Sequence, residues 1–414
     1  MYSRTNTRGN GPRGRSRFSS GNRKFSHASQ GSRGGFRGAP KRRGPADERI
    51  NPSRFINKVV AVEEAAPYQP AHSFADFAIH PRLKELIAAK GFTAPTPIQD
   101  QAIEPILEGK DVVGIANTGT GKTAAFLIPL INRVVTNDYE RVLVVVPTRE
   151  LALQIEEEFR GLSRGSGLRS VVIVGGASFG PQLAQLRYEN DFVIGTPGRL
   201  KDMIERGKIN LADFTTLVLD EADRMLDMGF VNDMRELVAG MPEEHQTLFF
   251  SATVSAAIEK LIAEFLHAPL RVSVKTRDTS ENVEQDVVRV AEGMSKFDTL
   301  HALLGGDEFQ KVLVFGRTKH GVEKLAKALT EKGVLAESIH GNKTHSKRQK
   351  ALGAFKTNKV KVLVATDVAA RGLDIPDVSH VINFELPATY DDYVHRIGRT
   401  GRGAKRGKAL TFIG

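Results

Sequence analysis

Short apolar runs rich in β-branched residues alternate with longer stretches of helical periodicity from about residue 73 onward. Six such runs form a first series, and each is too short to be a helix of ordinary length. Continuous apolar runs of this kind are typical of strands that are buried on both faces of a sheet. The predicted strands are Val112–Ile115, Val142–Val146, Val171–Val174, Phe192–Ile194, Thr216–Leu219 and Thr247–Phe250.

Amphipathic helices are predicted between these strands. In residues 149–159, for example, Leu151, Ile155 and Phe159 recur every four residues and form one apolar stripe. Strands that alternate with amphipathic helices indicate an α/β domain, in which helices cover both faces of a parallel sheet.

A second series of strands predicts a second α/β domain. The polar segment 275–282 has no periodicity and is predicted to be a linker. We therefore expect domains at 73–274 and 283–414, with ligands bound beyond the carboxyl ends of the strands. The second-series strands are Val312–Phe315, Glu337–Ile339, Val360–Ala365, Val381–Phe384 and Ala409–Ile413.

The basic charge of the chain is concentrated at its start. Residues 1–46 contain ten arginines, two lysines and no acidic residue, whereas the whole chain has a net charge of +11. This Gly-, Arg- and Ser-rich tail has too few apolar residues to form a core, so we expect it to be disordered and to continue into a linker at 47–72. It could contact RNA through arginines and isolated aromatics, or act as a solubilising extension; the salt dependence of RNA binding would separate the two.

The amino-acid composition excludes several kinds of chemistry and indicates where the protein works. The 414 residues include no cysteine, which excludes disulfides, thiol catalysis and cysteine-ligated zinc. No apolar run approaches the length of a membrane span, and the first residues lack a signal-peptide core. We expect a cytoplasmic protein that does not bind membranes.

Two segments predict a nucleoside triphosphate site. Residues 116–123 read Ala-Asn-Thr-Gly-Thr-Gly-Lys-Thr after a predicted strand, so backbone N–H groups can surround phosphate oxygens. Lys122 adds a positive charge, and the Thr123 hydroxyl can bind Mg²⁺. Residues 220–223 read Asp-Glu-Ala-Asp after another predicted strand, and such carboxylates can hold the metal and orient a water molecule.

The chain resembles the DEAD-box ATP-dependent RNA helicases, which are superfamily 2 helicases, and specifically the bacterial type. The resemblance covers about Phe74 to the C-terminus and includes many motifs in the family's order. Ala116 stands where the strict phosphate-loop pattern has glycine, and the family tolerates this change. The resemblance implies two tandem RecA-like domains, the first of which binds ATP.

Roles in the ATP site follow from the resemblance. It implies catalytic roles for Lys122, Asp220 and Glu221, metal binding by Thr123 and Asp220, and arginine fingers at Arg399 and Arg402. The Gln99 amide can pair with adenine through one donor and one acceptor. The other implied nucleotide contacts are Phe74, Phe92, Thr118, Gly119, Thr120, Gly121 and Asp374, and the residues that couple the site to domain closure are Asp223, Ser251, Thr253 and His395.

The resemblance also implies a track for one RNA strand, bound through phosphates and ribose hydroxyls rather than bases. His345 departs from the family, which usually has Gln there, so its contact is not carried over. The implied RNA contacts are Pro147, Thr148, Arg149, Gly176, Thr196, Pro197, Gly198, Arg199, Arg317, Gly341, Arg348, Thr366, Arg371 and Gly372.

These residues predict an RNA-stimulated ATPase. If ATP and single-stranded RNA each contact both domains, each favours domain closure and strengthens binding of the other. The resemblance adds that closure bends one strand and so unwinds short duplexes or remodels RNA–protein complexes. Two alternatives remain: an ATP-dependent RNA clamp that separates no strands, and a DNA-directed motor, which the motif set disfavours.

Overall fold

The computed structural model describes residues 55–56, 68–117, 119–274, 283–370, 375–401 and 406–413. The predicted tail at 1–46, most of the linker at 47–72 and the linker at 275–282 lie outside these ranges. So do five of the predicted site residues, namely Thr118, Arg371, Gly372, Asp374 and Arg402.

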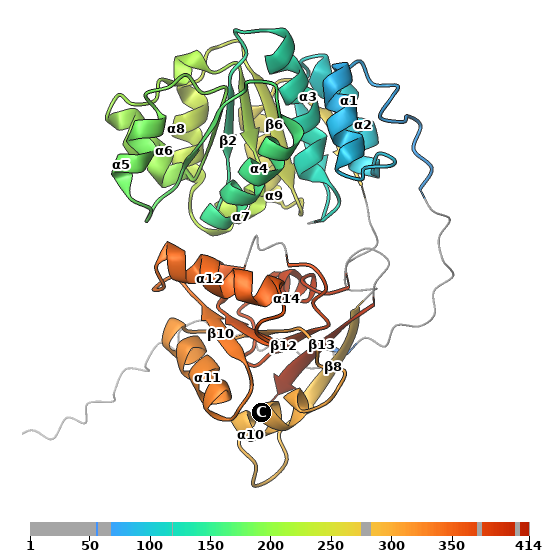
Figure 1. Cartoon of the computed structure of the whole chain (residues 1–414), viewed down its shortest axis with the longest axis vertical. Helices are drawn as coiled ribbons and strands as arrows, with labels where there is room; N and C mark the ends of the chain where they lie inside the picture. Colours follow the sequence, from blue (N-terminus) through green and yellow to red (C-terminus); the bar gives the residue numbers. More distant parts are fainter. Residues whose placement is uncertain are drawn as a thin grey trace, which may run out of the picture. The chain divides into compact units, whose positions relative to one another are not determined.

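The N-terminal lobe, residues 68–274, is built on a seven-stranded parallel sheet (Figure 1). Its strand order is β3-β4-β2-β5-β6-β1-β7. Every strand therefore points the same way, and the loops that follow the strands gather at one edge of the sheet. The strands are β1 (Val112–Ile115), β2 (Val142–Val145), β3 (Ser170–Ile173), β4 (Phe192–Gly195), β5 (Thr216–Leu219), β6 (Gln246–Ser251) and β7 (Leu270–Ser273).

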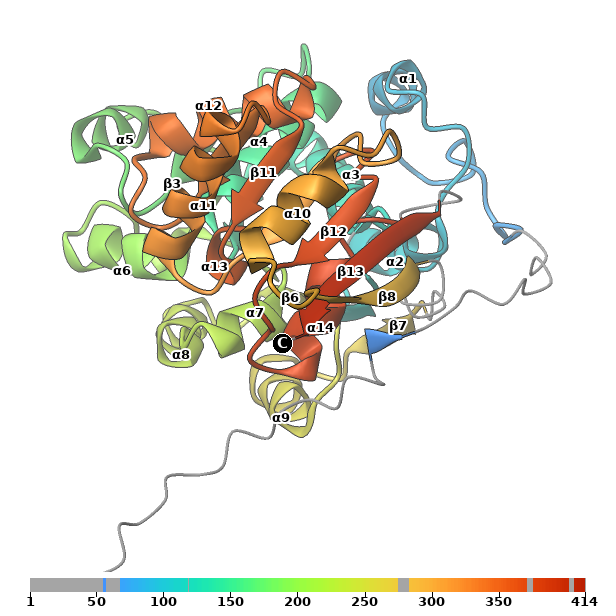
Figure 2. The ribbon, with the colours of Figure 1, turned by 90° about the horizontal axis from the view of Figure 1, so that it is seen from below.

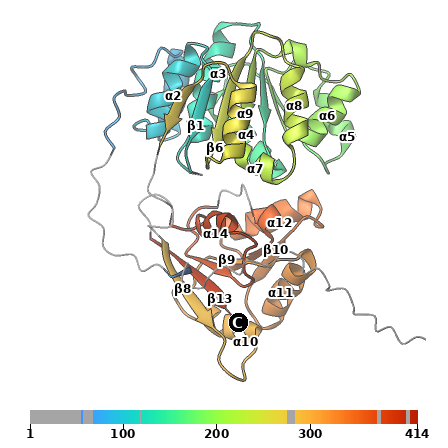
Figure 3. The same cartoon turned by 180° about the vertical axis from the view of Figure 1, so that it is seen from behind.

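Helices cover both faces of this sheet, and the sheet separates two hydrophobic cores. One core lies between the sheet and α1 to α4, and the other lies between the sheet and α6 to α9. Figure 3, which is seen from behind, shows α8 and α9 on the second face. The helices are α1 (Pro81–Ala89), α2 (Pro97–Leu107), α3 (Lys122–Thr136), α4 (Arg149–Leu162), α5 (Phe179–Gln185), α6 (Pro197–Glu205), α7 (Ala222–Asp227), α8 (Val231–Ala239) and α9 (Ala256–Phe265).

The C-terminal lobe, residues 283–413, has a six-stranded parallel sheet in the order β10-β11-β9-β12-β13-β8. Helices α10 and α11 cover one face of it, as Figure 2 shows, and α12, α13 and α14 cover the other. The strands are β8 (Val283–Arg289), β9 (Val312–Phe315), β10 (Ala336–Ile339), β11 (Val362–Ala365), β12 (His380–Asn383) and β13 (Gly407–Ile413). The helices are α10 (Lys296–Leu304), α11 (Lys319–Glu331), α12 (His345–Lys356), α13 (Asp367–Ala370) and α14 (Tyr390–Ile397).

The predicted fold class is confirmed, because both lobes have a parallel sheet covered by helices on both faces. All eleven predicted strands are present, with ends that differ by at most two residues. The strands β7 and β8 were not predicted. Both lie at the edge of a sheet, and their sequences Leu-Arg-Val-Ser and Val-Glu-Gln-Asp-Val-Val-Arg lack a continuous apolar run because one side is exposed.

Two described pieces of the segment predicted as a linker at 47–72 pack onto the lobes. The Phe55 side chain is fully buried in the core of the C-terminal lobe, where its ring centroid lies 4.7 Å from that of Tyr393. Farther along, the Tyr68 hydroxyl donates a 2.5 Å hydrogen bond to the buried carboxylate of Asp100 in α2, and the His72 ring nitrogen Nδ1 lies 2.8 Å from it. These pieces are therefore parts of the folded lobes.

Candidate nucleotide and RNA sites

The glycine-rich loop after β1 is shaped for close backbone approach. Gly119 and Gly121 have φ angles of 87° and 94°, in the left-handed region that favours glycine. A Cβ atom on Gly121 would lie 2.5 Å from Nε2 of Gln99, so a larger residue there would have to displace the Gln99 amide. Helix α3 begins directly afterwards at Lys122, and its free N–H groups therefore face the loop.

The loop also positions its polar side chains. Lys122 is buried and its Nζ donates a 2.7 Å hydrogen bond to the carbonyl oxygen of Ala116. The Thr120 hydroxyl donates to the carbonyl oxygen of Asn117 at 2.8 Å. Thr123 lies in the first turn of α3 and lines the same cavity as Lys122.

Gln99 connects the predicted adenine site to the phosphate loop. Its Oε1 accepts a hydrogen bond from the backbone N–H of Thr96, and its Nε2 donates to the carbonyl oxygen of Gly121 at 3.1 Å. A primary amide has two donors and two acceptor lone pairs, so one of each is still available for a base edge. Nearby, the rings of Phe74 and Phe92 are stacked with centroids 6.2 Å apart, and Phe92 lines the cavity.

Two carboxylates of residues 220–223 line this cavity as well. Asp220 is 2% exposed, and burial raises its pKa to about 6 although the positive charge of Lys122 opposes the shift. Glu221 has a φ angle of 53°, a left-handed conformation that a residue with a long side chain seldom adopts. The backbone at Glu221 is therefore strained, and this strain lies at a residue that is predicted to be catalytic.

Glu221 forms a buried ion pair that was not predicted. The guanidinium of Arg224, one turn along α7, donates to Oε2 of Glu221, and both side chains are almost completely buried. The only sequence signal was the three-residue spacing between an acid and an arginine on one helix. The ion pair fixes the direction in which the Glu221 carboxylate points.

Asp223 joins residues 220–223 to the segment after β6. Its Oδ2 accepts hydrogen bonds from the backbone N–H of Ala252 at 3.1 Å, from the backbone N–H of Thr253 at 3.0 Å and from the Thr253 hydroxyl at 3.1 Å. The Ser251 hydroxyl donates to the carbonyl oxygen of Thr253 at 2.8 Å. One carboxylate in the first turn of α7 thus links this helix to residues 252 and 253.

The residues present fit a nucleoside triphosphate with a divalent cation. A buried carboxylate whose pKa is raised would be held ionised by a cation beside it. No cluster of three or more metal-binding side chains occurs among the described residues, and Mg²⁺ needs none because it usually binds one or two carboxylates, phosphate oxygens and water. One cavity is lined by Phe92, Gln99, Gly119, Gly121, Lys122, Thr123, Asp220 and Glu221.

Several predicted RNA contacts gather at the same edge of the N-terminal sheet. Gly176 has a φ angle of 66°, and the Arg149 guanidinium lies so close that a Cβ atom on Gly176 would be 2.0 Å from Nη2. Burial lowers the pKa of Arg149. The Thr196 hydroxyl accepts a 3.4 Å hydrogen bond from the N–H of Gly175, and Arg199 donates to the carbonyl oxygen of Ala177 at 3.4 Å.

The other predicted RNA contacts follow strands or begin helices, as expected. Thr148 caps α4, with its hydroxyl accepting from the N–H of Leu151 at 3.3 Å, and Thr366 directly precedes α13. The remaining described candidates are Pro147 after β2, Pro197 and Gly198 in the first turn of α6, Arg317 after β9, Gly341 after β10 and Arg348 in α12.

A buried arginine that was not predicted holds α14 in place. The Arg396 guanidinium, 2% exposed, donates to both carboxylate oxygens of Asp367 at 2.5 and 2.8 Å. It also donates to Asn383 Oδ1 at 3.1 Å and to the Glu385 carbonyl oxygen at 2.7 Å. The next turn contains Arg399, which is 5% exposed and whose Nε donates to the carbonyl oxygen of His395 at 3.4 Å. Arg396 thus fixes the end of α14, which lies directly before the turn that contains Arg399.

Comparisons with known proteins identify the family. Residues 96–261 match the DEAD/DEAH box helicase family, and residues 295–404 match the helicase conserved C-terminal domain. The DEAD-box ATP-dependent RNA helicase CshA of Bacillus subtilis is 46% identical over 343 residues, which is 82% of this chain and 69% of the relative. The chain belongs to the DEAD-box ATP-dependent RNA helicases. The ATP-dependent RNA helicase DeaD of Mycobacterium tuberculosis is 44% identical over 86% of the chain and 63% of its own length.

Solved structures agree with the fold of this DEAD-box protein. Dbp5 of S. cerevisiae bound to RNA and ADP BeF3 has a TM-score of 0.74 at 29% identity, covering 83% of this chain and 90% of that chain. Mss116p bound to ssRNA and AMP-PNP has a TM-score of 0.72 at 32% identity, covering 81% and 72%. In the part of the DEAD-box chain that the structure describes, no helix is long and apolar enough to cross a membrane.

Proposed function

We propose that the chain hydrolyses ATP at the loop around Lys122 when its two lobes close on the nucleotide and on single-stranded RNA. The observation that supports this most is the hydrogen bonding of Asp223. Its carboxylate connects Ala222–Asp227, which follows the candidate catalytic Glu221, to residues 251–253. Because Asp223 joins the nucleotide site to residues 252 and 253 by hydrogen bonds, the site can respond to a rearrangement of the loops at this edge of the sheet.

Each residue of the site has a defined task in the proposal. Lys122 and the N–H groups at the start of α3 bind the phosphates. Thr123 and Asp220 would hold Mg²⁺, which supplies positive charge to the phosphate oxygens when bound. Glu221, oriented by Arg224, accepts a proton from the attacking water.

The C-terminal lobe supplies the remaining positive charge in this proposal. Arg399 and Arg402 act as arginine fingers, and groups of this kind contribute about 10³ to 10⁵ in rate. Arg399 is 5% exposed and its Nε donates to the carbonyl oxygen of His395, and in this proposal its guanidinium meets a phosphate when the lobes close. Hydrolysis is therefore expected to be slow until RNA favours closure, and closure separates the strands of short duplexes. We also propose that the protein works in the cytoplasm, in keeping with its lack of cysteine.

The test compares ATP hydrolysis by the full chain alone, with single-stranded RNA and with DNA of the same sequence. We expect strong stimulation by RNA and little by DNA. Equal stimulation by both would overturn the RNA assignment. A displacement assay on a short RNA duplex, run beside it, should release one strand in the presence of ATP; binding without release would leave a clamp as the activity.

A further inference from the structure

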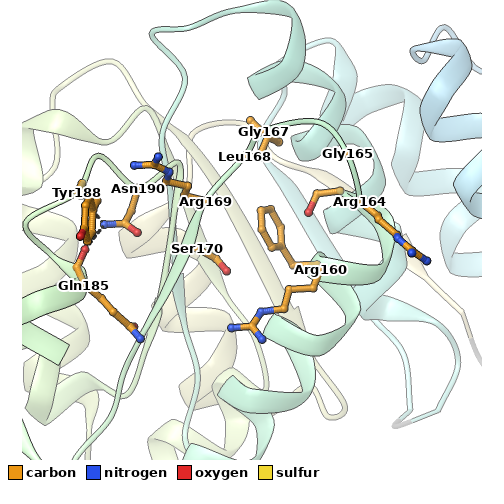
Figure 4. A pocket seen from close by; sticks show the side chains of 12 residues that line it. Arg160, Arg164, Gly165, Gly167, Leu168, Arg169, Ser170, Gln185, Tyr188 and Asn190 are labelled. Atoms are coloured by element: carbon orange, nitrogen blue, oxygen red, sulfur yellow. Dashed lines mark hydrogen bonds between the residues drawn. The ribbon is translucent and has the colours of Figure 1, made fainter. Parts of the chain in front are cut away.

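A cavity of about 570 Å³ lies in the N-terminal lobe where β3 and β4 begin (Figure 4). Its walls are the end of α4, the loop that leads to β3, and the segment between α5 and β4. In a parallel sheet the beginnings of the strands lie at the edge opposite their ends. The cavity is therefore at the far edge of the sheet from the phosphate loop, residues 220–223 and Arg149.

The cavity has a strongly basic lining. Arg160, Arg164 and Arg169 line it and are all exposed, whereas no acidic side chain lines it. Arg160 is paired with Glu156 at 2.5 Å, but no acceptor in the described part of the chain pairs with the guanidinium of Arg164. A polyanion that entered the cavity would thus meet three cations and displace at most one existing ion pair.

An aromatic ring stands beside these arginines. Tyr188 is 64% exposed, and the Arg169 guanidinium lies 5.5 Å from the centre of its ring. A large aromatic surface that is left in water costs free energy, and an arginine beside it gives a planar surface on which a base can stack. Figure 4 shows Tyr188 and Arg169 on one side of the cavity and Arg160 and Arg164 on the other.

Hydrogen bonds within the two loops that carry these groups shape the backbone before any ligand arrives. Gly165 and Gly167 have φ angles of 79° and 83°, and the Ser166 hydroxyl donates to the Ser163 carbonyl oxygen at 2.7 Å, which fixes the loop that contains Arg164. On the opposite wall, the Asn190 amide donates to the carbonyl oxygens of Gln185 and Tyr188 at 3.1 and 2.7 Å. Binding therefore costs little loop ordering.

We propose that this cavity, which we call the arginine pocket and define by Arg160, Arg164, Arg169 and Tyr188, is a second binding site for single-stranded RNA. Clustered arginines that grip phosphates beside an aromatic ring that stacks on a base are the two components of single-strand binding without sequence preference. The inference rests on the proposed function, because RNA held by the loops at the other edge would supply the strand. A strand longer than that track would reach the arginine pocket and be retained there during opening of the lobes.

The test measures RNA affinity against RNA length. Arg164→Gln with Arg169→Gln removes two cations, and Tyr188→Ala removes the ring; all three side chains are exposed, so folding should be preserved. The controls are Arg235→Gln and Tyr139→Ala, which remove a partly exposed arginine that is paired with Glu264 and a tyrosine that is 87% exposed, both elsewhere on the lobe. Each variant is titrated with RNA of about 10 nucleotides, a length that one binding module can cover, and with RNA three times longer.

We expect both arginine-pocket variants to bind the longer RNA at least about fivefold more weakly than the controls do, since one stacked base alone is worth that much. The double arginine variant should also reduce the slope of log affinity against log salt by about 0.7 for each phosphate that the variant no longer binds. Affinity for the short RNA and ATP hydrolysis stimulated by it should be unchanged.

Longer RNA that binds the variants and the controls equally would overturn the inference. In that case polyglutamate, titrated in the same series, would show what the pocket binds instead. Loss of polyglutamate binding in the variants would assign the pocket to an acidic protein. The wild-type protein in the same series separates this inference from the proposed function. If short RNA fails to stimulate its ATP hydrolysis, the proposed function fails; if stimulation is normal and the length effect is absent, only the arginine pocket fails.

Discussion

Replacing Gly176 with alanine should weaken RNA binding without touching the nucleotide site. The added Cβ atom would lie 2.0, 2.3 and 2.4 Å from Nη2, Nη1 and Cζ of Arg149, where ordinary contacts need more than 3.4 Å. The Arg149 guanidinium must therefore move by more than an ångström. The variant tests whether the position of this guanidinium, rather than its charge alone, is what binds RNA.

Gly176→Ala has two separate free-energy costs, one in stability and one in RNA binding. An alanine at a φ angle of 66° is strained by about 1–2 kcal/mol, which lowers stability but leaves affinity unaffected if the strain is equal in the free and bound protein. Removing one hydrogen bond from a charged group to phosphate takes away about 1.5–3 kcal/mol of binding free energy. The dissociation constant for single-stranded RNA should thus rise about 10- to 100-fold.

The assay is fluorescence anisotropy with labelled single-stranded RNA at several salt concentrations. Binding one phosphate fewer should lower the salt slope by about 0.7. Gly180→Ala is the matched control, because a Cβ atom there meets nothing within 4 Å and the φ angle is not positive. An unchanged affinity and slope in Gly176→Ala, with the control behaving like wild type, would refute a phosphate contact by Arg149.

Two further predictions concern the segments that dock beside α2 and in the C-terminal core. Phe55→Ala should lower the unfolding free energy of the C-terminal lobe by about 1.5–3 kcal/mol, which is the free energy gained by burying one phenylalanine side chain. The loss should not exceed this value, because the segment that carries Phe55 can lose no more than the free energy with which it binds the lobe. Ile56→Ala, at a side chain 47% exposed, should change it by less than about 0.5 kcal/mol in the same denaturant titration; equal effects would contradict the Phe55 contact. The hydrogen bond to Asp100 raises the pKa of His72 in the folded protein. The contribution of protonated His72 to folding stability is therefore complete below the ordinary histidine pKa of about 6.5, and it is lost as the pH rises through the higher pKa of the folded state. An NMR titration of His72 and melting curves of His72→Gln against pH would test this, and a titration midpoint at or below about 6.5 would disprove it.

Much of the fold was predictable because buried parallel strands have a simple pattern. Runs such as Val312–Phe315 are apolar at every position, and the structure places β9 at the same residues. The edge strands β7 and β8 were missed because they are half exposed and carry charged residues such as Arg271 and Glu284. Their assignment depends on the neighbouring strand, which the local sequence does not contain.

The candidate site was predictable only as far as its motifs are contiguous. The loop before Lys122 and the acids from Asp220 to Asp223 could be found because their residues are consecutive. The contact between Asp367 and Arg396 spans 29 positions, and the docking of Phe55 beside Tyr393 spans far more, so no local pattern indicated either. Both contacts are fixed by tertiary packing.

The central claim is that ATP and RNA favour the same closed arrangement, and its most direct test is a thermodynamic cycle on Glu221→Gln. This variant keeps the size of the side chain and should bind ATP without hydrolysing it, which allows equilibrium measurements. The account predicts that saturating ATP tightens RNA binding and that saturating RNA tightens ATP binding by the same factor. RNA affinity that is identical with and without ATP in this variant would contradict the account.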